Sequence, residues 1–516
     1  MGTKARNCTI IVGGMKIISL VLLALTTMIL YGCGNSNSGA DGADYIGNAW
    51  ENGVWENDTR PNANNAASTL AGLSPIDHET AANIFMRIEA ILDADGGELW
   101  GADLHGPIVF ADAESRYAVA NMADIGGEIF VPYGNLYVGR IPDDIRISSY
   151  NVEFGGRRWS MVSWGWVLNH LNEPQRLMLS ILHKNFHAKQ PYIFEGERSW
   201  YDTSYVEELD VRITLRLEIN ALLSALRAVA EGDRQETLES IRNALSIRAE
   251  RHRNHPDFTA HDATFEVVEG TAVFTEVMLM FGTLEERINY LEMQMYEEPD
   301  LQMFGYNTGA LYALLLYEIG VDWRAGFSWE ADLSAIMREA AGLDEVILFN
   351  EIHLERYGYS AIRLAEEAWQ IEMERLTQEA KDAFSGSLLF LYSRGEFNDW
   401  DLDVRLLYPE WFMPANYDLL DYGRDDVVWR PTDAFGNPNL TGTVFYGDFI
   451  YTGYFGELEV TGGHILLWHL MWRHSVPAHG VEVSGNIVRG DNWVLTLNEG
   501  FELRDVGGGH FGVGEV

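Results

Sequence analysis

The chain has 516 residues, of which 47% are hydrophobic and 22% charged, an ordinary composition for a globular protein. Its formal net charge is −41 at pH 7, and no cluster of basic residues offsets it. A protein this acidic repels nucleic acid, anionic lipid and anionic wall polymers, so these are excluded as partners. At roughly 100–200 residues per domain, the length allows about two to four domains.

The N-terminus carries a short apolar segment. An uncharged run over residues 17–30 follows Lys16 and leads to Leu-Tyr-Gly-Cys33, after which the chain turns polar. A positive start, followed by an apolar run too short to span about 30 Å of hydrocarbon, indicates an export signal. Leu-x-Gly-Cys resembles the lipobox of bacterial lipoproteins, although Tyr31 is bulky for its place. This resemblance implies that Cys33 carries a lipid.

We therefore expect residues 1–33 to be a signal peptide with its lipidated cysteine. The lipid would hold the mature protein at the extracytoplasmic face of the cell membrane. Cleavage before Cys33 removes three cations and no acid, which lowers the formal charge to −44. The second cysteine, Cys8, precedes the signal, so we expect no internal disulfide in the mature chain.

The next segments differ in composition and in apolar spacing. Residues 34–75 are rich in Asn, Ala, Gly, Asp and Ser, which predicts a flexible tether. Residues 76–385 and 386–516 are expected to form two folded domains. In the first of these, helical spacing predicts a helix over residues 81–92. Short β-like runs then predict a small sheet with strands over residues 107–110, 128–132, 136–138 and 158–164.

Residues 173–383 have mostly helical spacing. Asn172 is expected to cap a helix over residues 173–189 that stops before Pro191. Further helices are predicted over residues 204–230, 234–253, 262–281, 284–296, 307–319, 328–341 and 351–384. After Gly386, alternating segments separated by glycines predict a β-rich C-terminal domain. The predicted fold class is therefore α+β, with a small N-terminal sheet, a mostly helical domain and a β-rich end.

Two histidines four residues apart, His183 and His187, lie on the helix predicted over residues 173–189. Residues at this spacing share one helix face, so both imidazoles can bind one ion. Zinc binds neutral imidazole, and in catalytic sites it has three protein ligands and one open position. The alternative is that hydrogen-bond partners in the core satisfy both histidines.

The helix predicted over residues 262–281 offers the third ligand. Glu269 lies on the side of its apolar stripe, where a carboxylate is costly unless it is paired or binds a metal. Glu266, one turn away, is the alternative ligand. Glu276 is expected to accept a hydrogen bond from a ligand histidine. Gly270 would let another helix approach closely.

These residues resemble a known pattern. The stretch from Ile181 to His187 resembles the H-E-x-x-H helix of zinc metallopeptidases, and residues 269–274 resemble the glutamate-bearing helix of the gluzincin group. Further stretches are similar to an uncharacterised family of bacterial lipoproteins with this layout: residues 158–162, 212–223 and 306–311. The similarity covers about residues 100–380, and it implies a zincin-like fold with a zinc ion and a peptide or protein ligand.

The resemblance also implies roles for residues around the metal. The strand before the first helix would line the substrate cleft, which places Arg158, Trp159 and Ser160 beside an extended substrate. Tyr306 lies downstream, where related enzymes have a tyrosine or histidine that stabilises the oxyanion.

Lys184 is the main departure from the pattern, because it stands where the family has the glutamate that deprotonates the metal-bound water. A protonated lysine cannot take that proton. A neutral lysine could, but only with a pKa about three units below the ordinary value. We therefore expect a degenerate, surface-tethered metallopeptidase that binds a peptide or protein with weak or no hydrolysis.

Two other functions are compatible with the lipid anchor. A solute-binding lipoprotein captures a small ligand, but two-lobed binders are built from alternating βαβ units, and this chain has a long helical middle. A structural envelope protein without a metal site is the third alternative, and no motif argues against it. Metal content separates the peptidase-like interpretation from both.

Overall fold

The structure is a computed structural model of the full chain. It describes residues 75–515, apart from several internal segments. The residues left out of this range are 114, 148, 298–300, 344–348, 350–351, 385–387, 393–404, 407–441, 454, 469–472 and 508–509. The predicted signal peptide, Cys33 and all but the last residue of the predicted tether lie outside the described residues.

The described chain begins with helix α4 (His78–Asp95), which is longer than the predicted helix over residues 81–92. The carboxylate of Asp77 caps it by accepting a hydrogen bond from the amide of Thr80. Gly96 ends the helix in the left-handed conformation, which glycine adopts without a steric penalty. The buried face of α4 belongs to the main hydrophobic core.

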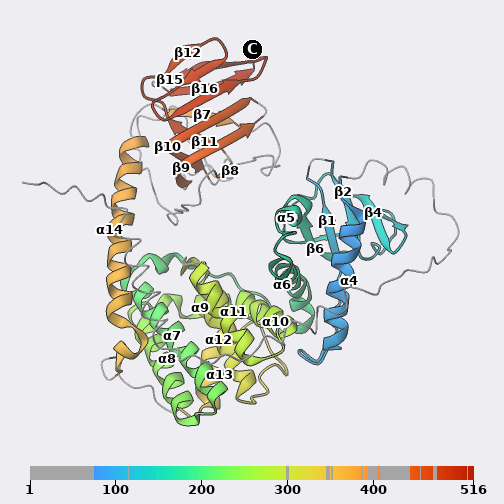
Figure 1. Ribbon diagram of the computed structural model, residues 1–516, viewed down its shortest axis with the longest axis vertical. Coiled ribbons are helices and arrows are strands. Elements are labelled where there is room, and N and C mark those ends of the chain that lie inside the picture. The colour runs from blue at the N-terminus through green and yellow to red at the C-terminus, as the bar shows by residue number, and fades with distance from the viewer. Residues whose placement is uncertain are drawn as a thin grey trace, which may run out of the picture. The chain divides into compact units, whose positions relative to one another are not determined.

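A six-stranded sheet follows, with the strand order β3-β4-β2-β1-β6-β5 (Figure 1). Its strands are β1 (Ile108–Ala111), β2 (Tyr117–Ala120), β3 (Phe130–Tyr133), β4 (Leu136–Arg140), β5 (Asn151–Phe154) and β6 (Arg157–Ser163). Among these strands β1 and β6 pair in parallel, and the other neighbours pair antiparallel. In this order β5 is an edge strand, whereas β6 has a partner on both sides.

The sequence predicts β1, β3, β4 and β6 close to their observed bounds, but it does not predict β2 and β5. Strand β2 reads Tyr-Ala-Val-Ala, and alanine has little preference for strands. It is nevertheless completely buried, because it pairs with β1 on one side and β4 on the other. Tertiary pairing, rather than local propensity, therefore decides this part of the sheet.

Strand β6 leads through the short helix α5 (Trp164–Asn169) into α6 (Pro174–Ile193). Two details predicted for α6 are wrong. Glu173 takes the N-cap position in place of Asn172, and no side chain caps the helix. The helix also continues past Pro191, because a proline this close to the C-terminal end removes only one hydrogen bond from the ladder.

The region after α6 is helical, as the sequence predicts. Its helices are α7 (Leu209–Glu231), α8 (Arg234–Asn254), α9 (Thr259–Phe265), α10 (Thr271–Met280), α11 (Leu284–Glu297), α12 (Phe304–Glu318), α13 (Leu333–Ala340) and α14 (Tyr359–Phe384). Short 3-10 turns are η2 (Ser204–Glu207), η3 (Pro256–Phe258), η5 (Leu301–Met303) and η7 (Leu354–Tyr357).

The helix predicted over residues 262–281 is not continuous α-helix. A π-helical segment, η4 (Glu266–Gly270), joins α9 to α10. π-helical segments are rare, and they occur frequently at functional sites. The alternative ligands Glu266 and Glu269 both lie on this segment.

One hydrophobic core joins the helices to one face of the first sheet. It contains Phe110 from β1, Phe186 from α6 and Leu222 from α7. The other face of the sheet has a separate cluster around Trp159 and Met161. Because α6 packs on β6 on one side and on α10 on the other, its position is fixed from two directions.

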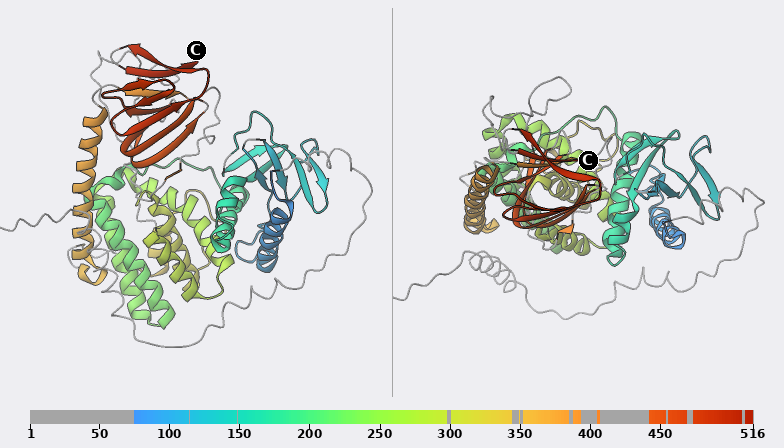
Figure 2. Two further views of the ribbon diagram at one scale, coloured as in Figure 1. Left: turned by 45° about the horizontal axis from the view of Figure 1, so that its top comes forward. Right: turned by 90° about the horizontal axis from the view of Figure 1, so that it is seen from above.

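A second sheet forms the C-terminal region, again as predicted, and Figure 2 shows its strands side by side in a curved sheet. Its main path has the order β12-β13-β14-β10-β11-β7-β16-β15, and β9 pairs with β10 and β8. The strands are β7 (Leu388–Tyr392), β8 (Arg405–Leu406), β9 (Gly442–Gly453), β10 (Gly456–Trp468), β11 (Arg473–Pro477), β12 (Glu482–Ser484), β13 (Ile487–Arg489), β14 (Trp493–Leu497), β15 (Phe501–Gly507) and β16 (His510–Glu515). With helices and sheets in separate regions of the chain, the class is α+β.

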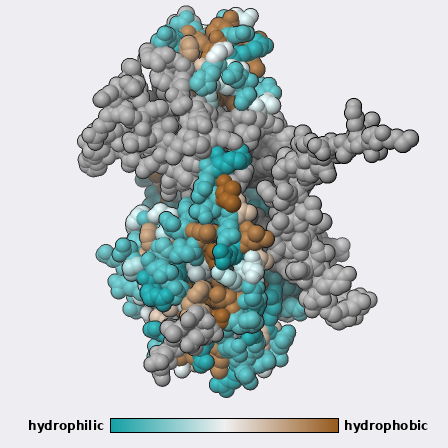
Figure 3. Space-filling model, turned by 90° about the vertical axis from the view of Figure 1, so that its left-hand side faces the viewer, coloured by the Kyte–Doolittle hydropathy of each residue, from teal (hydrophilic) through white to brown (hydrophobic). Residues whose placement is uncertain are grey.

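The surface over α14 is mixed in character. Leu364 and Ile371 of this helix are 60% and 68% exposed. Figure 3 shows hydrophobic residues on this side in small groups among hydrophilic ones, as is usual for solvated surfaces. Within the described part of the chain, no helix has the length and apolar character needed to cross a membrane.

Candidate metal centre

Helix α6 places His183 and His187 on one face. Leu182 and Phe186 lie in the core, which fixes the rotation of the helix about its axis. The Nε2 atoms of the two histidines are 2.9 Å apart. Their side chains are only 13% and 15% exposed. Two imidazole nitrogens this close need a proton or a metal ion between them.

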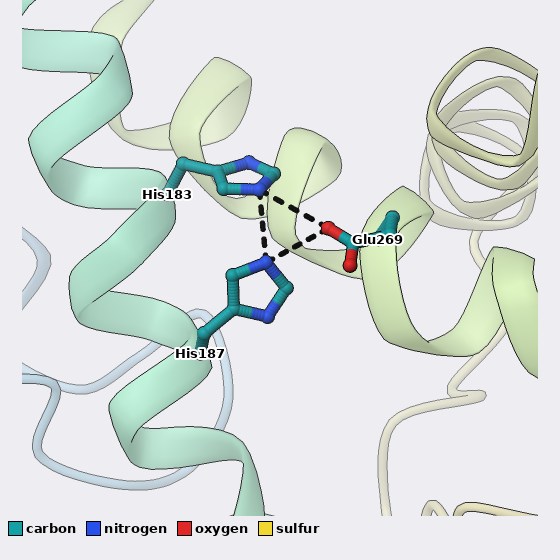
Figure 4. A group of neighbouring side chains, drawn as sticks. All are labelled: His183, His187 and Glu269. Carbon is teal, nitrogen blue, oxygen red and sulfur yellow. Dashed lines mark hydrogen bonds and ion pairs between the residues drawn. The ribbon is translucent and has the colours of Figure 1, made fainter. Parts of the chain in front are cut away.

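Glu269 reaches the same point from the π-helical segment η4 (Figure 4). Its Oε2 lies 2.9 Å from Nε2 of His187 and 3.4 Å from Nε2 of His183. As the sequence predicts, Gly270 allows another helix to approach, because a Cβ there would lie 2.5 Å from the Cα of Gly309 in α12. The close packing of α12 therefore depends on two glycines and holds the glutamate-bearing turn in place.

Hydrogen bonds from Gln190 determine which nitrogen of His187 carries the proton. The amide Nε2 of Gln190 donates to the carbonyl oxygen of Val268 at 2.7 Å and to Oγ1 of Thr271 at 3.0 Å. Because the carbonyl can only accept, the other amide atom, Oε1, is the one that faces His187. It lies 2.8 Å from Nδ1 of His187, so Nδ1 donates and Nε2 carries a lone pair.

Glu276 orients His183 in the same way. Oε2 of this buried carboxylate lies 3.1 Å from Nδ1 of His183, the contact that the sequence predicts for Glu276. Nδ1 therefore donates, and the lone pair of Nε2 is left for the shared point. An acceptor on the outer nitrogen is typical of metal-binding histidines. Once His183 has lost its second proton, three lone pairs, two from nitrogen and one from oxygen, converge.

The three atoms are placed so that one ion can reach all of them. They lie within 4.8 Å of one another. From their separations, the circle through them has a radius of about 1.8 Å, shorter than the roughly 2.0–2.2 Å of zinc bonds to nitrogen and oxygen. His183, His187 and Glu269 would hold a zinc ion as its three protein ligands, and a fourth position would remain for water or a ligand. Among the described residues, this group can therefore hold a metal ion.

The charges of the site favour a cation. Burial lowers the pKa of His183, but Glu269 and Glu276 outweigh this effect and raise the pKa to about 9. Burial raises the pKa of Glu269, and the two histidines outweigh it and hold this pKa well below its usual value. Burial and the charge of His183 lower the pKa of His187. The site therefore stabilises positive charge, whether a proton or a metal ion carries it.

Lys184 lies between the two histidines in sequence and about 100° from His183 around the helix. Its carbonyl oxygen accepts hydrogen bonds from Nδ2 of Asn151 at 2.9 Å and from Oγ of Ser160 at 3.1 Å, which tie α6 to β5 and β6. Its side chain is half-buried. Burial lowers its pKa, and the charges of Glu269 and Glu276 oppose this effect.

Two tyrosines stand beside the candidate ligands. The ring of Tyr306, singled out from the sequence, stacks on His183 with centroids 5.6 Å apart and planes 9° apart. Tyr201, which the sequence does not indicate, donates from its hydroxyl to Oε1 of Glu269 at 3.5 Å. Burial and Glu269 raise the pKa of both tyrosines, that of Tyr201 to about 12. Both hydroxyls are therefore hydrogen-bond donors at neutral pH.

Glu266, the alternative ligand, does not reach the histidines. Its two oxygens accept hydrogen bonds from Arg248, at 2.6 Å and 2.7 Å. The hydroxyl of Thr308 donates to Oε1 of Glu266 at 2.6 Å. A carboxylate held on both oxygens in this way is not free to bind a metal ion, so Glu269 is the candidate for the third ligand.

Of the residues expected to line a substrate cleft, Arg158, Trp159 and Ser160, the last two are enclosed in the fold. Strand β6 pairs with β5 over residues 157–160 and with β1 over residues 160–163. Trp159 and Ser160 are fully buried, and Nε1 of Trp159 donates to the carbonyl oxygen of Phe154. Arg158 pairs with Glu153 at 3.2 Å. The edge strand beside β6 is β5.

A network of buried charges adjoins the candidate centre, and the sequence analysis did not identify it. Arg248 pairs with Glu218 at 3.0 Å in addition to Glu266. Arg251 pairs with Glu218 at 2.7 Å and with Asp262 at 3.4 Å. The network links α7, α8, α9 and η4. The spacing of Arg248 and Arg251, three residues apart on one helix face, is the only sequence signal for it.

Comparisons with protein-family models, with curated proteins and with solved structures give no match to this chain. The functional argument therefore depends on the geometry of the site itself.

Proposed function

We propose that this protein is a lipoprotein at the extracytoplasmic face of the cell membrane, with a gluzincin-like domain that binds zinc through His183, His187 and Glu269. In this proposal the domain binds a peptide or protein and hydrolyses it weakly or not at all. The membrane anchor is a lipid on Cys33. Each part has its own support and its own test.

The observation that carries the metal site is the convergence of three potential ligand atoms, from His183, His187 and Glu269, on one point. Both histidines donate from Nδ1, and Nε2 of each is turned to Oε2 of Glu269. Two neutral imidazoles and one carboxylate, with one open position, form a ligand set that zinc prefers. A zinc ion bound there would polarise a carbonyl or water oxygen at the open position.

The proposed loss of hydrolysis is supported by Lys184. The residue after the first histidine lies about 100° around the helix from that ligand, beside the face that carries both ligands, which is where a general base would have to act. Burial lowers the pKa of Lys184 from its ordinary value, and the charges of Glu269 and Glu276 oppose this effect by favouring the protonated form. A protonated amine has no lone pair with which to accept a proton.

The proposed peptide ligand is supported by the edge strand β5. Its Asn151 donates to the backbone of α6 at Lys184, so this edge begins beside the candidate metal ligands. Exposed strand edges bind extended peptides by adding a strand to the sheet. A peptide paired with β5 would pass close to the candidate metal centre.

Zinc content is the first test. The purified full chain should retain about one zinc ion per molecule after dialysis, because three protein ligands are in place. His187→Ala should lose this ion, since it removes one of three ligands. Metal analysis by mass spectrometry gives the stoichiometry. His353→Ala is a matched control, because His353 is exposed and on a different part of the chain, and it should retain zinc.

Glu276→Gln gives a graded version of the same test. It keeps an acceptor for Nδ1 of His183 and removes the charge, so zinc affinity should fall by about 10–100-fold without being lost. Wild-type protein that folds and binds no zinc would contradict the proposal. That result would favour a solute-binding or structural lipoprotein.

The anchor has a separate test. Cys33→Ser should release the protein from the membrane or leave its signal uncleaved, because Cys33 is the expected site of lipid attachment. Fractionation of the cells with detection of the full chain distinguishes these states. A processed Cys33→Ser protein that stays in the membrane fraction like wild type would show that the anchor lies elsewhere.

A further inference from the structure

A buried polar bridge, formed by the side chains of Gln190 and Thr271, joins the two helical elements that carry the candidate metal ligands. Gln190 of α6 is only 1% exposed, and Thr271 is completely buried. The amide Oε1 of Gln190 accepts from Nδ1 of His187 at 2.8 Å. Its Nε2 donates to the carbonyl oxygen of Val268 at 2.7 Å and to Oγ1 of Thr271 at 3.0 Å. One side chain therefore contacts a candidate ligand on α6 and the residue directly before Glu269 on η4.

The π-helical segment changes which donors meet its carbonyl groups. In an α-helix the amide of Thr271 would donate to the carbonyl of Val267, four residues back. Here it donates to the carbonyl of Glu266, five residues back. The carbonyl of Val267 accepts from the hydroxyl of Thr271 at 2.6 Å, and that of Val268 accepts from Gln190. The polar bridge therefore supplies side-chain donors to two buried carbonyl groups at the π-helical turn.

This turn also separates the directions of two carboxylates. In an α-helix, residues three apart lie on one face, so Glu266 and Glu269 would face the same way. In η4 they do not, because Glu266 accepts from Arg248 of α8 whereas Glu269 faces His187 of α6. The wider turn of a π-helix accounts for the difference. Whatever holds the π-helical turn therefore decides which carboxylate reaches the histidines.

We propose that Gln190 and Thr271 are positioning residues, which together hold the π-helical turn in the form that presents Glu269 to the two histidines. This proposal rests on the proposed metal site and adds what sets its geometry. Neither side chain would bind the ion, so both act through the ligands. Thr271 is the more informative of the two, because its hydroxyl contacts Gln190 and Val267, and neither of these is a candidate ligand.

The first test is the zinc affinity of the full chain, measured by competition with a metal-binding dye under conditions where every variant is folded. Thr271→Val keeps the shape of the side chain without its hydroxyl, and it should weaken zinc binding by about 10–100-fold, the usual effect of groups that orient metal ligands. Thr271→Ser restores the hydroxyl and should bind within a few-fold of wild type. Gln190→Met should lose at least as much affinity as Thr271→Val. Thr264→Val is the matched control and should bind like wild type, because the hydroxyl of Thr264 donates to the carbonyl of Ala260 within its own helix.

Cobalt(II) in place of zinc shows whether the weakened ligand is Glu269, because the visible absorption of cobalt depends on the ligands that it has. The spectra of Thr271→Val and Gln190→Met should move toward that of Glu269→Ala. Weaker binding with the spectrum of wild type would overturn the proposal, since a general loss of stability would give that result.

Hydrogen exchange of the metal-free chain tests the polar bridge without the metal site. Backbone amides over residues 266–272 should exchange faster in Thr271→Val and Gln190→Met than in wild type, whereas those of α8 should not. If wild type binds zinc, equal affinity of wild type and Thr271→Val overturns the proposal and leaves the metal site standing. If wild type binds no zinc, the metal site is contradicted, and equal exchange in wild type and Thr271→Val overturns the polar bridge as well.

Discussion

Lys184→Glu is expected to raise the zinc-dependent hydrolysis of generic peptides by about 10²–10⁴-fold over wild type, because a positioned general base contributes a factor of this size. The new carboxylate would lie beside the candidate ligands, about 100° around α6 from His183. The measurement is the rate of cleavage of a fluorogenic peptide library by the zinc-loaded full chain. Wild type should show little or no cleavage in the same assay.

Lys184→Gln is the matched control for this gain. Glutamine has nearly the shape of glutamate and removes the lysine charge, but its amide cannot take a proton, so it should not restore cleavage. Combining Lys184→Glu with His187→Ala should abolish any gain, since the metal would be lost. Strong cleavage by wild type that disappears in Lys184→Ala would show instead that lysine works as the base.

Helical spacing predicts most of the fold because it is a local property of the chain. Every long helix between α6 and α14 follows from it, with errors mainly at the ends. Strand β2 escapes prediction, since its burial comes from partners distant in sequence. The π-helical segment η4 escapes for the same reason: its extra residue is accommodated where α12 packs against Gly270.

The residues of the candidate site also divide into those that local spacing predicts and those that it does not. His183, His187 and Glu269 can be predicted, because two share a helix spacing and the third is a charge on an apolar stripe. Gln190 is missed although it lies three residues after His187, where its side chain can reach the imidazole. Tyr201 has no regular spacing to mark it, because it lies in a segment without helix or strand.

Breaking the buried charge network is expected to give the largest loss of stability. Burial lowers the pKa of Arg248, but Glu266 and Glu218 outweigh it and raise the pKa well above its ordinary value. Arg248→Met fills similar space and leaves Glu266 buried without its cation, which should cost about 3–5 kcal/mol in the free energy of unfolding. Urea unfolding followed by the helical circular dichroism signal measures the loss.

Two further variants show whether the lost charge pairing is the cause. Arg253→Met removes an arginine from the same helix, but its side chain is 62% exposed and pairs with Glu250 one turn earlier, so the change should cost about 1 kcal/mol or less. Arg248→Met combined with Glu266→Gln removes both buried charges and should recover about half of the loss. If the double variant is as unstable as Arg248→Met alone, the cost comes from packing and not from the stranded carboxylate. If it recovers, the pair Arg248 and Glu266 supports the π-helical turn that carries Glu269, and zinc affinity should recover with stability.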